Sequence, residues 1–364
     1  MNGPLLLSIV IFVPMIFVVA FTPFLTRKTE NFGVSIPESL YNREDFKTMR
    51  KKYAVTLIII GLLFCISYAI LSFQLSENII TILFTIIIVT YLIFGFLLYL
   101  PFHYKMKQIK ESENWKSTKS QTIVVDMKFR QEILVYSNWW FLTSALIIIV
   151  TLLLTFIYLN RIPEKLPMHI DFFGNISYEE KSFATLLFIP GMQLALLVLF
   201  IFLNLIIKHT KQQVSVANPE RSKKQNIIFR KRWSAYLICL GGLIELLLMY
   251  TQLTFIFPQL TKYTEIIIFS FVFLILLGTL LLAFITGQGG SRIKLNEHTS
   301  DQVIDRDDDQ YWKLGQFYVN KNDPAIFVEK RFGVGWTNNW AHPLSWIVVI
   351  GILLVILIPV LLLS

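Results

Sequence analysis

Long apolar stretches separated by polar segments recur along the whole chain. Eight of them reach the roughly 20 residues that a helix needs to cross a bilayer core of about 30 Å. They cover residues 4–24, 53–73, 79–101, 139–159, 183–207, 233–257, 264–285 and 344–363. The pattern predicts an all-α transmembrane protein, built as a polytopic bundle of eight helices.

Lys and Arg residues gather in every second gap between these stretches. Of the 33 in the chain, 29 lie in residues 25–52, 102–138, 208–232 and 286–343, whereas 4 lie in 74–78, 160–182 and 258–263. Because cytoplasmic loops retain Lys and Arg, we expect the basic loops to face the cytoplasm and both termini to lie outside. No positive charge precedes the first stretch, so we expect it to stay as a membrane helix and not to be cleaved as a signal peptide.

The net charge of +9 admits two interpretations. A basic chain can bind nucleic acid, but here the basic residues are spread over several loops and interleaved with acidic ones. Attraction to anionic lipid explains them, so we expect the lipid bilayer as a partner and no nucleic acid. Both cysteines, Cys65 and Cys239, lie inside apolar stretches, where a thiol acts as a small apolar group. The sequence indicates no metal site and no cofactor.

The chain divides into a seven-span domain over 1–285, a cytoplasmic module over 286–343 and the eighth helix over 344–364. Within the module, residues 315–319 and 325–329 are rich in aromatic and β-branched residues and flank the turn-forming sequence NKNDP, which predicts a β-hairpin. We expect its aromatic side chains to pack on the inner membrane face or on other cytoplasmic loops. An acidic run lacks the Gly and the distal Glu of a calcium loop, which favours a solvated turn over a cation site. The run comprises Asp305, Asp307, Asp308 and Asp309.

Two basic loops show patterns of their own. Ser35 and Glu38 have the spacing of a capping box, which predicts the start of a short amphipathic helix at the membrane surface. The apolar face of this helix would hold Phe46, Met49 and Tyr53. We expect the basic cluster at 50–52 to meet lipid headgroups. The most basic loop, 208–232, is interpreted as a solvated linker that faces the lipid surface.

Glu245 lies at the centre of a predicted span. A charged side chain there costs on the order of 3 kcal/mol, so Glu245 should face the bundle and be either paired or neutral. Two interpretations stay open. Glu245 is a proton- or cation-coupling group of a transporter, or it is a neutral side chain that hydrogen-bonds Gln193, Thr251 or another polar group.

Small residues and a proline mark two further positions within the spans. Gly241 lies one turn before Glu245 on the same face, where a small residue lets another helix approach. Pro190 and Gly191 either break the fifth helix beside a cavity or produce a simple kink.

The loop over 160–182 contains a distinctive set of residues: Leu166, Pro167, His169, Gly174 and Lys181. In its spacing this set resembles the bacterial membrane domain of unknown function 1648, which is also present in SdpI-like immunity and signalling proteins. The turn after Gly174 departs from the pattern of that family. His169 is interpreted either as a pH sensor or ligand contact, or as a side chain that hydrogen-bonds the loop in place.

The module resembles a second uncharacterised bacterial domain, of unknown function 5808. Several motifs carry this resemblance, and their residues are Asp308, Asp309, Tyr311, Trp312, Gly315, Asn320, Asp323, Pro324, Arg331, Gly333 and Trp336. The element FGVSIPE over 32–38 is similar to a segment of the same membrane proteins.

The resemblances imply a protein of the bacterial cytoplasmic membrane with an accessory role in envelope stress sensing or in immunity to a membrane-active agent. A transcriptional regulator or an export system would be its partner. The alternative is a secondary transporter coupled through Glu245. The sequence contains no enzyme motif such as HExxH, a phosphate loop or a nucleophile elbow, so we expect no enzymatic activity.

Overall fold

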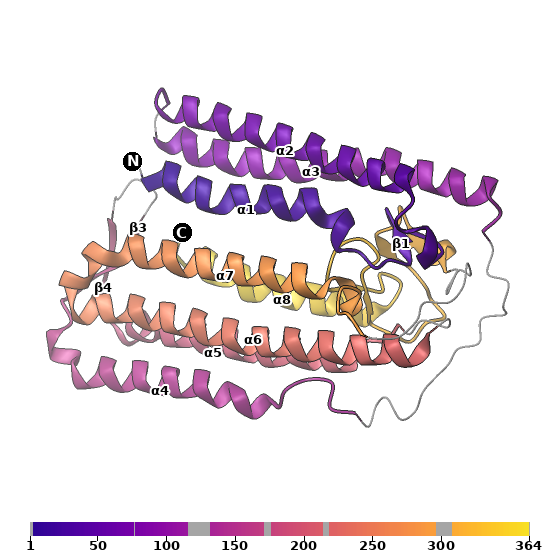
Figure 1. Ribbon diagram of the computed structural model, residues 1–364. Helices are drawn as coiled ribbons and strands as arrows, with labels where there is room; N and C mark the ends of the chain where they lie inside the picture. Colours follow the sequence, from indigo (N-terminus) through magenta and orange to yellow (C-terminus); the bar gives the residue numbers. More distant parts are fainter. Residues whose placement is uncertain are drawn as a thin grey trace.

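The computed structural model describes residues 3–75, 77–115, 132–170, 176–213, 218–295 and 308–363. These residues form eight α-helices that run side by side (Figure 1): α1 (Gly3–Leu25), α2 (Glu44–Ser72), α3 (Glu77–Ser112), α4 (Leu142–Ile157), α5 (Phe183–His209), α6 (Pro219–Ile256), α7 (Thr264–Thr286) and α8 (Pro343–Leu363). Each predicted span corresponds to one of them. Six regions are long and apolar enough to cross a membrane, and in α1 and α8 the described side chains form shorter apolar stretches, Ile9–Leu25 and Pro343–Val355. Such helices indicate a multi-pass membrane protein.

The basic and the less basic gaps lie at opposite ends of the bundle. The loop after α1, the N-terminal part of α6 and the segment between α7 and α8 share one end, which we call the basic end (Figure 1). The other end holds both chain termini and the antiparallel hairpin of β3 (Lys165–Ile170) and β4 (Ile176–Glu180), and we call it the hairpin end. The alternation of charge along the sequence thus becomes a separation of charge in space.

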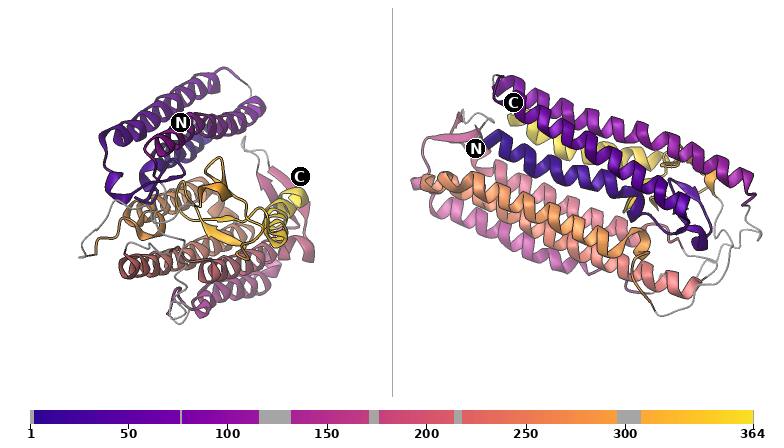
Figure 2. Two further views of the ribbon diagram at one scale, coloured as in Figure 1. Left: turned by 90° about the vertical axis from the view of Figure 1, so that its right-hand side faces the viewer. Right: turned by 45° about the horizontal axis from the view of Figure 1, so that its top comes forward.

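The helices pack in two groups. α1, α2 and α3 pack together, as do α4, α5 and α6, while α7 lies against both α1 and α6, and α8 contacts α5. Seen from the basic end, the segment before α8 lies between the two groups (Figure 2). The outward faces are apolar: on α2, for example, Ile59, Leu63 and Ile66 are more than half exposed. Such faces suit contact with lipid.

Three helices extend further into the basic end than the apolar stretches predict: α2 begins at Glu44, α3 ends at Ser112 and α6 begins at Pro219.

The predicted amphipathic helix is the first part of α2, which continues into the second span. Phe46, Met49 and Tyr53 are buried on one face, as predicted. The capping box is wrong, because Ser35 ends a small hairpin of β1 (Glu30–Asn31) and β2 (Val34–Ser35). A 3-10 turn, η1 (Glu38–Leu40), follows without a side-chain cap.

Two basic residues expected near lipid or water are buried instead. Arg50 is 2% exposed, and it donates hydrogen bonds to Asn31 Oδ1 at 3.2 Å and to the carbonyl oxygen of Tyr41 at 2.7 Å. Its guanidinium also lies 4.1 Å from the centre of the Tyr41 ring. Arg230, from the loop interpreted as a solvated linker, is fully buried on α6. Guanidinium groups tolerate burial when most of their donors are satisfied in this way.

The fifth helix is not broken at Pro190 and Gly191. α5 runs without interruption from Phe183 to His209 with Pro190 inside it. It begins at a capping box in which Ser182 and Thr185 bond each other's backbone N–H groups. The sequence alternative of a discontinuous helix beside a cavity is therefore wrong.

The segment before α8 forms two short hairpins. β5 (Trp312–Lys313) pairs with β6 (Phe317–Tyr318), and β7 (Phe327–Glu329) pairs with β8 (Trp336–Asn338). The predicted strands exist, but the prediction that they pair with each other across NKNDP is wrong. The Asn339 side chain occupies that turn: its Oδ1 accepts from Asn320 N–H at 3.0 Å, and its Nδ2 donates to the carbonyl oxygens of Asn320 at 2.8 Å and Asp323 at 3.1 Å.

Candidate functional site

A row of buried polar side chains runs between α4, α5 and α6. Its centre is Glu245, which is fully buried and whose two carboxylate oxygens have no hydrogen-bond partner among the described residues. Gln193 lies beside it, but its Nε2 donates to the backbone oxygen of Glu245 at 3.1 Å and, weakly, to Thr151 Oγ1 at 3.4 Å. Thr251, another expected partner, donates to the carbonyl oxygen of Leu247. The carboxyl group is therefore positioned by packing.

Towards the hairpin end the row continues through further polar groups. Thr155 lies one turn after Thr151 on α4, and its hydroxyl donates to the carbonyl oxygen of Thr151 at 2.8 Å. Gln252 on α6 donates through Nε2 to Thr155 Oγ1 at 3.0 Å and to the carbonyl oxygen of Leu186 at 3.1 Å. Polar contacts thus extend from the level of Glu245 almost to the end of the helices.

Towards the basic end the row is interrupted by apolar side chains. Phe141, Ile148, Leu197 and Phe200 form a buried cluster there. Gly241 leaves room for it, because a Cβ atom at this position would lie 3.4 Å from the Phe200 ring. The predicted close approach at this glycine is confirmed. Polar contacts resume only beyond the cluster.

The resumed contacts join the residues before α4 to the last part of α5 and to α6. Asn204 on α5 donates to Asn138 Oδ1 at 2.7 Å and to the carbonyl oxygen of Tyr136 at 3.1 Å. Its Oδ1 accepts a 2.7 Å hydrogen bond from Ser234 on α6, which itself accepts from the N–H of Tyr136. This network links α4, α5 and α6 beside a cavity of about 860 Å³ that Tyr136, Asn138 and Phe141 line.

The β3–β4 hairpin closes the other end of the row. Leu166 is fully buried there and, with Ile162, packs against residues of α5 and α6. Lys181 ties the hairpin to the end of α4 by donating to the carbonyl oxygens of Leu159 and Ile162, both at 3.0 Å. Pro167 pairs with Tyr178 in the hairpin. Leu166, Pro167 and Lys181, three of the residues singled out in this loop, therefore have structural roles in the hairpin. His169 pairs with Ser177 in the backbone ladder, but its side chain and the whole of Gly174 lie outside the described residues.

At the basic end, Arg331 holds the module to the group formed by α1, α2 and α3. Its guanidinium forms ion pairs with Asp308 and Asp309 and donates to the carbonyl oxygen of Gly33 at 3.2 Å. Asp309 also pairs with Lys110 of α3 at 2.7 Å. The acidic run, so far as it lies within the described residues, is therefore not the solvated turn that the sequence favoured.

Glu329 holds the module to both helix groups. This fully buried carboxylate pairs with Arg27, which follows α1, and accepts a 2.7 Å hydrogen bond from Asn226 on α6. Arg230 approaches it to 3.5 Å and also donates to the carbonyl oxygens of Ile207 at 2.7 Å and Thr210 at 3.0 Å. Burial, together with the nearby Arg27, lowers the pKa of Arg230 to about 10. The guanidinium stays charged at neutral pH.

Aromatic residues complete this attachment. Phe332 stacks on Phe32 and contacts Tyr99 of α3, with ring centroids 6.0 Å and 4.5 Å apart. Trp336 packs on Phe229 of α6 at 5.4 Å. Trp312 lies under the Arg331 guanidinium at 5.2 Å. The prediction that the module's aromatic residues pack against other loops of the same end is confirmed for Phe332 and Trp336, whereas Trp312 packs within the module.

Two glycines bring the module against the loop after α1. Gly33 and Gly315 both have positive φ, +73° and +69°. A Cβ on Gly315 would lie 2.4 Å from the Tyr99 hydroxyl oxygen and 2.7 Å from His103 Nδ1. The Tyr99 hydroxyl bonds the carbonyl oxygens of Phe32 and Leu314, both at 3.0 Å. Only glycine allows this approach and this backbone conformation together.

The loop that follows β6 is organised by Asp323. Its Oδ2 accepts from Tyr318 at 2.7 Å and pairs with Lys211 at 2.6 Å, and its Oδ1 accepts from Ala325 N–H at 3.0 Å across Pro324. Asn320 contacts the Tyr318 hydroxyl. Gly333 has a φ of +93° in the turn between β7 and β8. These residues shape the module.

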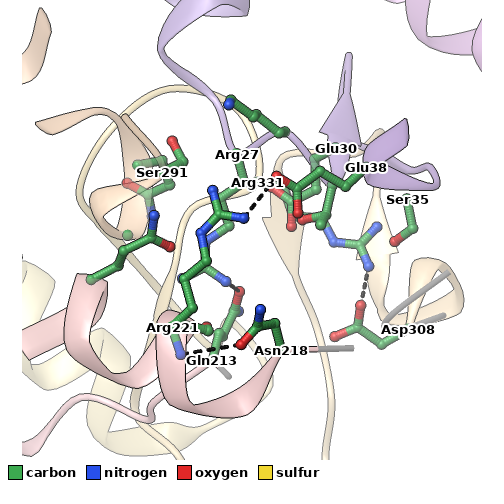
Figure 3. Close-up of a pocket in the computed structure, with 16 residues that line it drawn as sticks. Arg27, Glu30, Ser35, Glu38, Gln213, Asn218, Arg221, Ser291, Asp308 and Arg331 are labelled. Atoms are coloured by element: carbon green, nitrogen blue, oxygen red, sulfur yellow. Dashed lines mark hydrogen bonds and ion pairs between the residues drawn. The ribbon is translucent and has the colours of Figure 1, made fainter. Parts of the chain in front are cut away.

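A polar cavity of about 90 Å³ lies beside the ion pairs (Figure 3). Its charged lining residues are Arg27, Lys28, Glu30, Glu38, Arg221, Asp308 and Arg331. Arg221 comes from the first turn of α6, where Asn218 caps the helix, and it lies 3.9 Å from Glu38. Because both signs of charge line the cavity, its chemistry favours no single class of ligand.

Acid should loosen the module from α3 through Asp309. Burial alone would raise the pKa of Asp309, but Arg331 and Lys110 lower it from 3.8 to about 2. The ionised group therefore stabilises the fold above pH ~4, and this contribution of about 2 kcal/mol is lost as the pH falls through ~2. Tryptophan fluorescence in detergent micelles should show this acid transition. It should be weakened in Asp309→Asn, and an identical transition in that variant would contradict the assignment.

The sequence missed the residues on which the module's attachment depends. Arg27, Lys110, Arg230 and Glu329 are charges near the ends of apolar segments, and such charges usually face solvent. The one available signal was Glu329, which ends a strand rich in apolar residues. Its partners could not be recognised, because they come from segments far away in the sequence.

A family model described as "Family of unknown function (DUF5808)" matches residues 321–346. The match includes Arg331, Gly333 and Trp336 and confirms the predicted resemblance for this segment of the module, which is a small part of the chain. The family models give no match to domain 1648 in the hairpin. Neither the comparison with curated proteins nor that with solved structures found a match.

Proposed function

We propose that this chain is a multi-pass protein of the bacterial cytoplasmic membrane that senses envelope stress or confers immunity to a membrane-active agent. The observation that carries the proposal is the double attachment of the module. Arg331 and Asp309 connect it to α3, and Glu329 connects it to Arg27 and to α6. Any movement of one helix group against the other would change these contacts, which suits a signalling output.

The proposal places the basic end in the cytoplasm, because Lys and Arg are retained there. The hairpin end then faces outward, with Leu166 and Lys181 linking the hairpin to α4, α5 and α6. An agent that displaces the hairpin would act on the same helix group that holds Glu329. A transcriptional regulator or an export system at the basic end would receive the signal.

Deletion of the gene should lower survival or alter transcription when cells meet a membrane-active peptide. Wild-type protein should restore the response. Glu329→Gln should fail to restore it, because the module loses its buried acid, whereas Glu44→Gln should restore it, since Glu44 is 85% exposed. A panel would include pore-forming, cationic and cell-wall-precursor-binding peptides. Equal survival and unchanged transcription of the deletion strain across that panel would refute the proposal.

Glu245 favours a second candidate, a secondary transporter. A buried carboxyl group without a hydrogen-bond partner among the described residues is a group that can exchange a proton or a cation. Proteoliposomes should then show solute flux that depends on a proton or sodium gradient and that Glu245→Gln abolishes. Gradient-independent leakage, unchanged by the substitution, would exclude this role.

A further inference from the structure

A groove lies along α5 at the basic end of the bundle. It is the cavity of about 860 Å³ between α5, the start of α4 and the segment over 132–138 that precedes α4. Ligand pockets in proteins usually measure about 300–1,000 Å³, so the groove has room for one ligand. Leu142 and Leu205 in its lining are 57% and 37% exposed, so the groove is open at the surface of the bundle.

The part of the groove inside the bundle is apolar and has the length of a hydrocarbon chain. The buried side chains of Phe141 and Leu197 line it, together with Ala145 on α4 and Ile201 on α5. On α5 the lining extends from Leu197 to Lys208, which at 1.5 Å per residue is about 16 Å along the helix. This is about half of the 30 Å thickness of a bilayer core, and therefore the depth of one leaflet.

The mouth of the groove is polar and carries one charge of each sign. Glu132 and Lys208 are its charged lining residues; both are exposed, and neither forms an ion pair within the described ranges. Trp139 beside them is 76% exposed, and indole side chains favour the headgroup zone of a membrane. The groove thus differs from the polar cavity of Figure 3, several of whose charged residues pair with one another.

The wall of the groove formed by 132–138 is held in place by buried hydrogen bonds. Asn204 donates to the carbonyl oxygen of Tyr136 at 3.1 Å and to Asn138 Oδ1 at 2.7 Å. The Ser234 hydroxyl accepts from the N–H of Tyr136 at 2.9 Å, and Leu134 in the same segment is buried. Because these bonds involve neither Glu132 nor Lys208, a ligand would meet an ordered wall with both charges available, which lowers the entropic cost of binding.

We propose that this groove binds one phospholipid with an ammonium headgroup, of the phosphatidylethanolamine type. Lys208 binds the lipid phosphate, Glu132 accepts hydrogen bonds from the lipid ammonium, and one acyl chain lies in the apolar part between α4 and α5. An anionic lipid such as phosphatidylglycerol fits less well, because it lacks the ammonium and leaves Glu132 beside its negative charge. The inference goes beyond the proposed role in sensing or immunity, because it concerns a resident lipid whichever response follows.

A photoactivatable phosphatidylethanolamine with a diazirine in one acyl chain provides the probe. The full chain would be reconstituted in phosphatidylcholine vesicles with a trace of this lipid, irradiated and digested, and peptide mass spectrometry would locate the adducts. They should concentrate on groove residues such as Ala145 and Ile201 and be scarce at Leu153, which is 55% exposed on the same α4 outside the groove. Adducts spread evenly over the exposed residues of α4 and α5 would overturn the proposal.

Competition by unlabelled lipids tests the headgroup. Unlabelled phosphatidylethanolamine should displace the probe from the groove at about a tenfold lower fraction of the bilayer than phosphatidylglycerol does, the factor expected for one hydrogen bond to a charged group. Glu132→Gln should remove this preference, and Glu132→Lys should reverse it, because the mouth then carries two positive charges. Equal or stronger displacement by phosphatidylglycerol in the wild type, or an unchanged preference in Glu132→Lys, would refute the assignment.

Two further variants test the phosphate contact and the acyl-chain site. Lys208→Gln should lower groove labelling about tenfold, whereas Lys105→Gln, at an exposed lysine of α3 at the same end, should leave it unchanged. Ala145→Trp fills the groove and should remove the adducts at Ile201, whereas Leu153→Trp, at the exposed position on the same helix, should keep them. Labelling of Ile201 that persists in Ala145→Trp would contradict the proposed position of the acyl chain.

Discussion

Glu329→Gln should lower the free energy of unfolding by about 3–5 kcal/mol, the usual cost of removing one partner of a buried ion pair. Glu329 is fully buried, and its loss leaves the guanidinium groups of Arg27 and Arg230 without their shared acid. The amide retains the shape of the side chain, so the effect reports charge and not volume. Reversible denaturation in mixed detergent micelles, followed by tryptophan fluorescence, would measure the change.

Glu44→Gln provides the matched comparison. Glu44 pairs with Lys47 at 2.7 Å on the surface of the same end, where its side chain is 85% exposed. Exposed pairs contribute about 0–1 kcal/mol, so this variant should unfold almost as wild type does. A Glu329→Gln protein as stable as Glu44→Gln would show that the module does not depend on its buried charge.

Gly315→Ala should destabilise the fold by about 2–4 kcal/mol, because a methyl group there combines overpacking with an unfavourable backbone conformation. The added Cβ would lie 2.4 Å from the Tyr99 hydroxyl oxygen, at a φ of +69°. We expect the Tyr99 bonds to Phe32 and Leu314 to be lost together with the contact. Thermal unfolding in detergent should therefore begin at a lower temperature than in the wild type.

Gly335→Ala separates the effect of the backbone conformation from the effect of overpacking. Gly335 also has a positive φ, +108°, but a Cβ there would meet nothing within 4 Å. This variant should show the backbone cost alone, about 1–3 kcal/mol, without any overpacking. If both variants lose equal stability, the close approach of the module to Tyr99 contributes nothing.

The spans and the two ends of the bundle could be predicted because they follow from local composition. An apolar stretch long enough to cross a membrane becomes a helix whatever its neighbours are. The face of α2 with Phe46, Met49 and Tyr53 followed from spacing for the same reason. Glu245 was recognised because one acid among some twenty apolar residues is conspicuous in the sequence alone.

The contacts of the basic end could not be predicted because they join distant segments. The strands over 315–319 and 325–329 were recognised from composition, but their partners depend on Asn339, which fills the turn between them. Arg50 and Arg230 resemble surface charges until the carbonyl groups and the acid that receive them are known. Periodicity indicates whether a residue is buried, and it contains no information about which distant residue it meets.

The ion cluster around Glu329 can form only late in the synthesis of the chain. Glu329 follows Arg27 by 302 positions and Arg230 by 99, so both guanidinium groups leave the ribosome well before their acid. Seven helices are translated by then, yet the basic end cannot close. A chain truncated before β7 would retain these arginines without their shared acid.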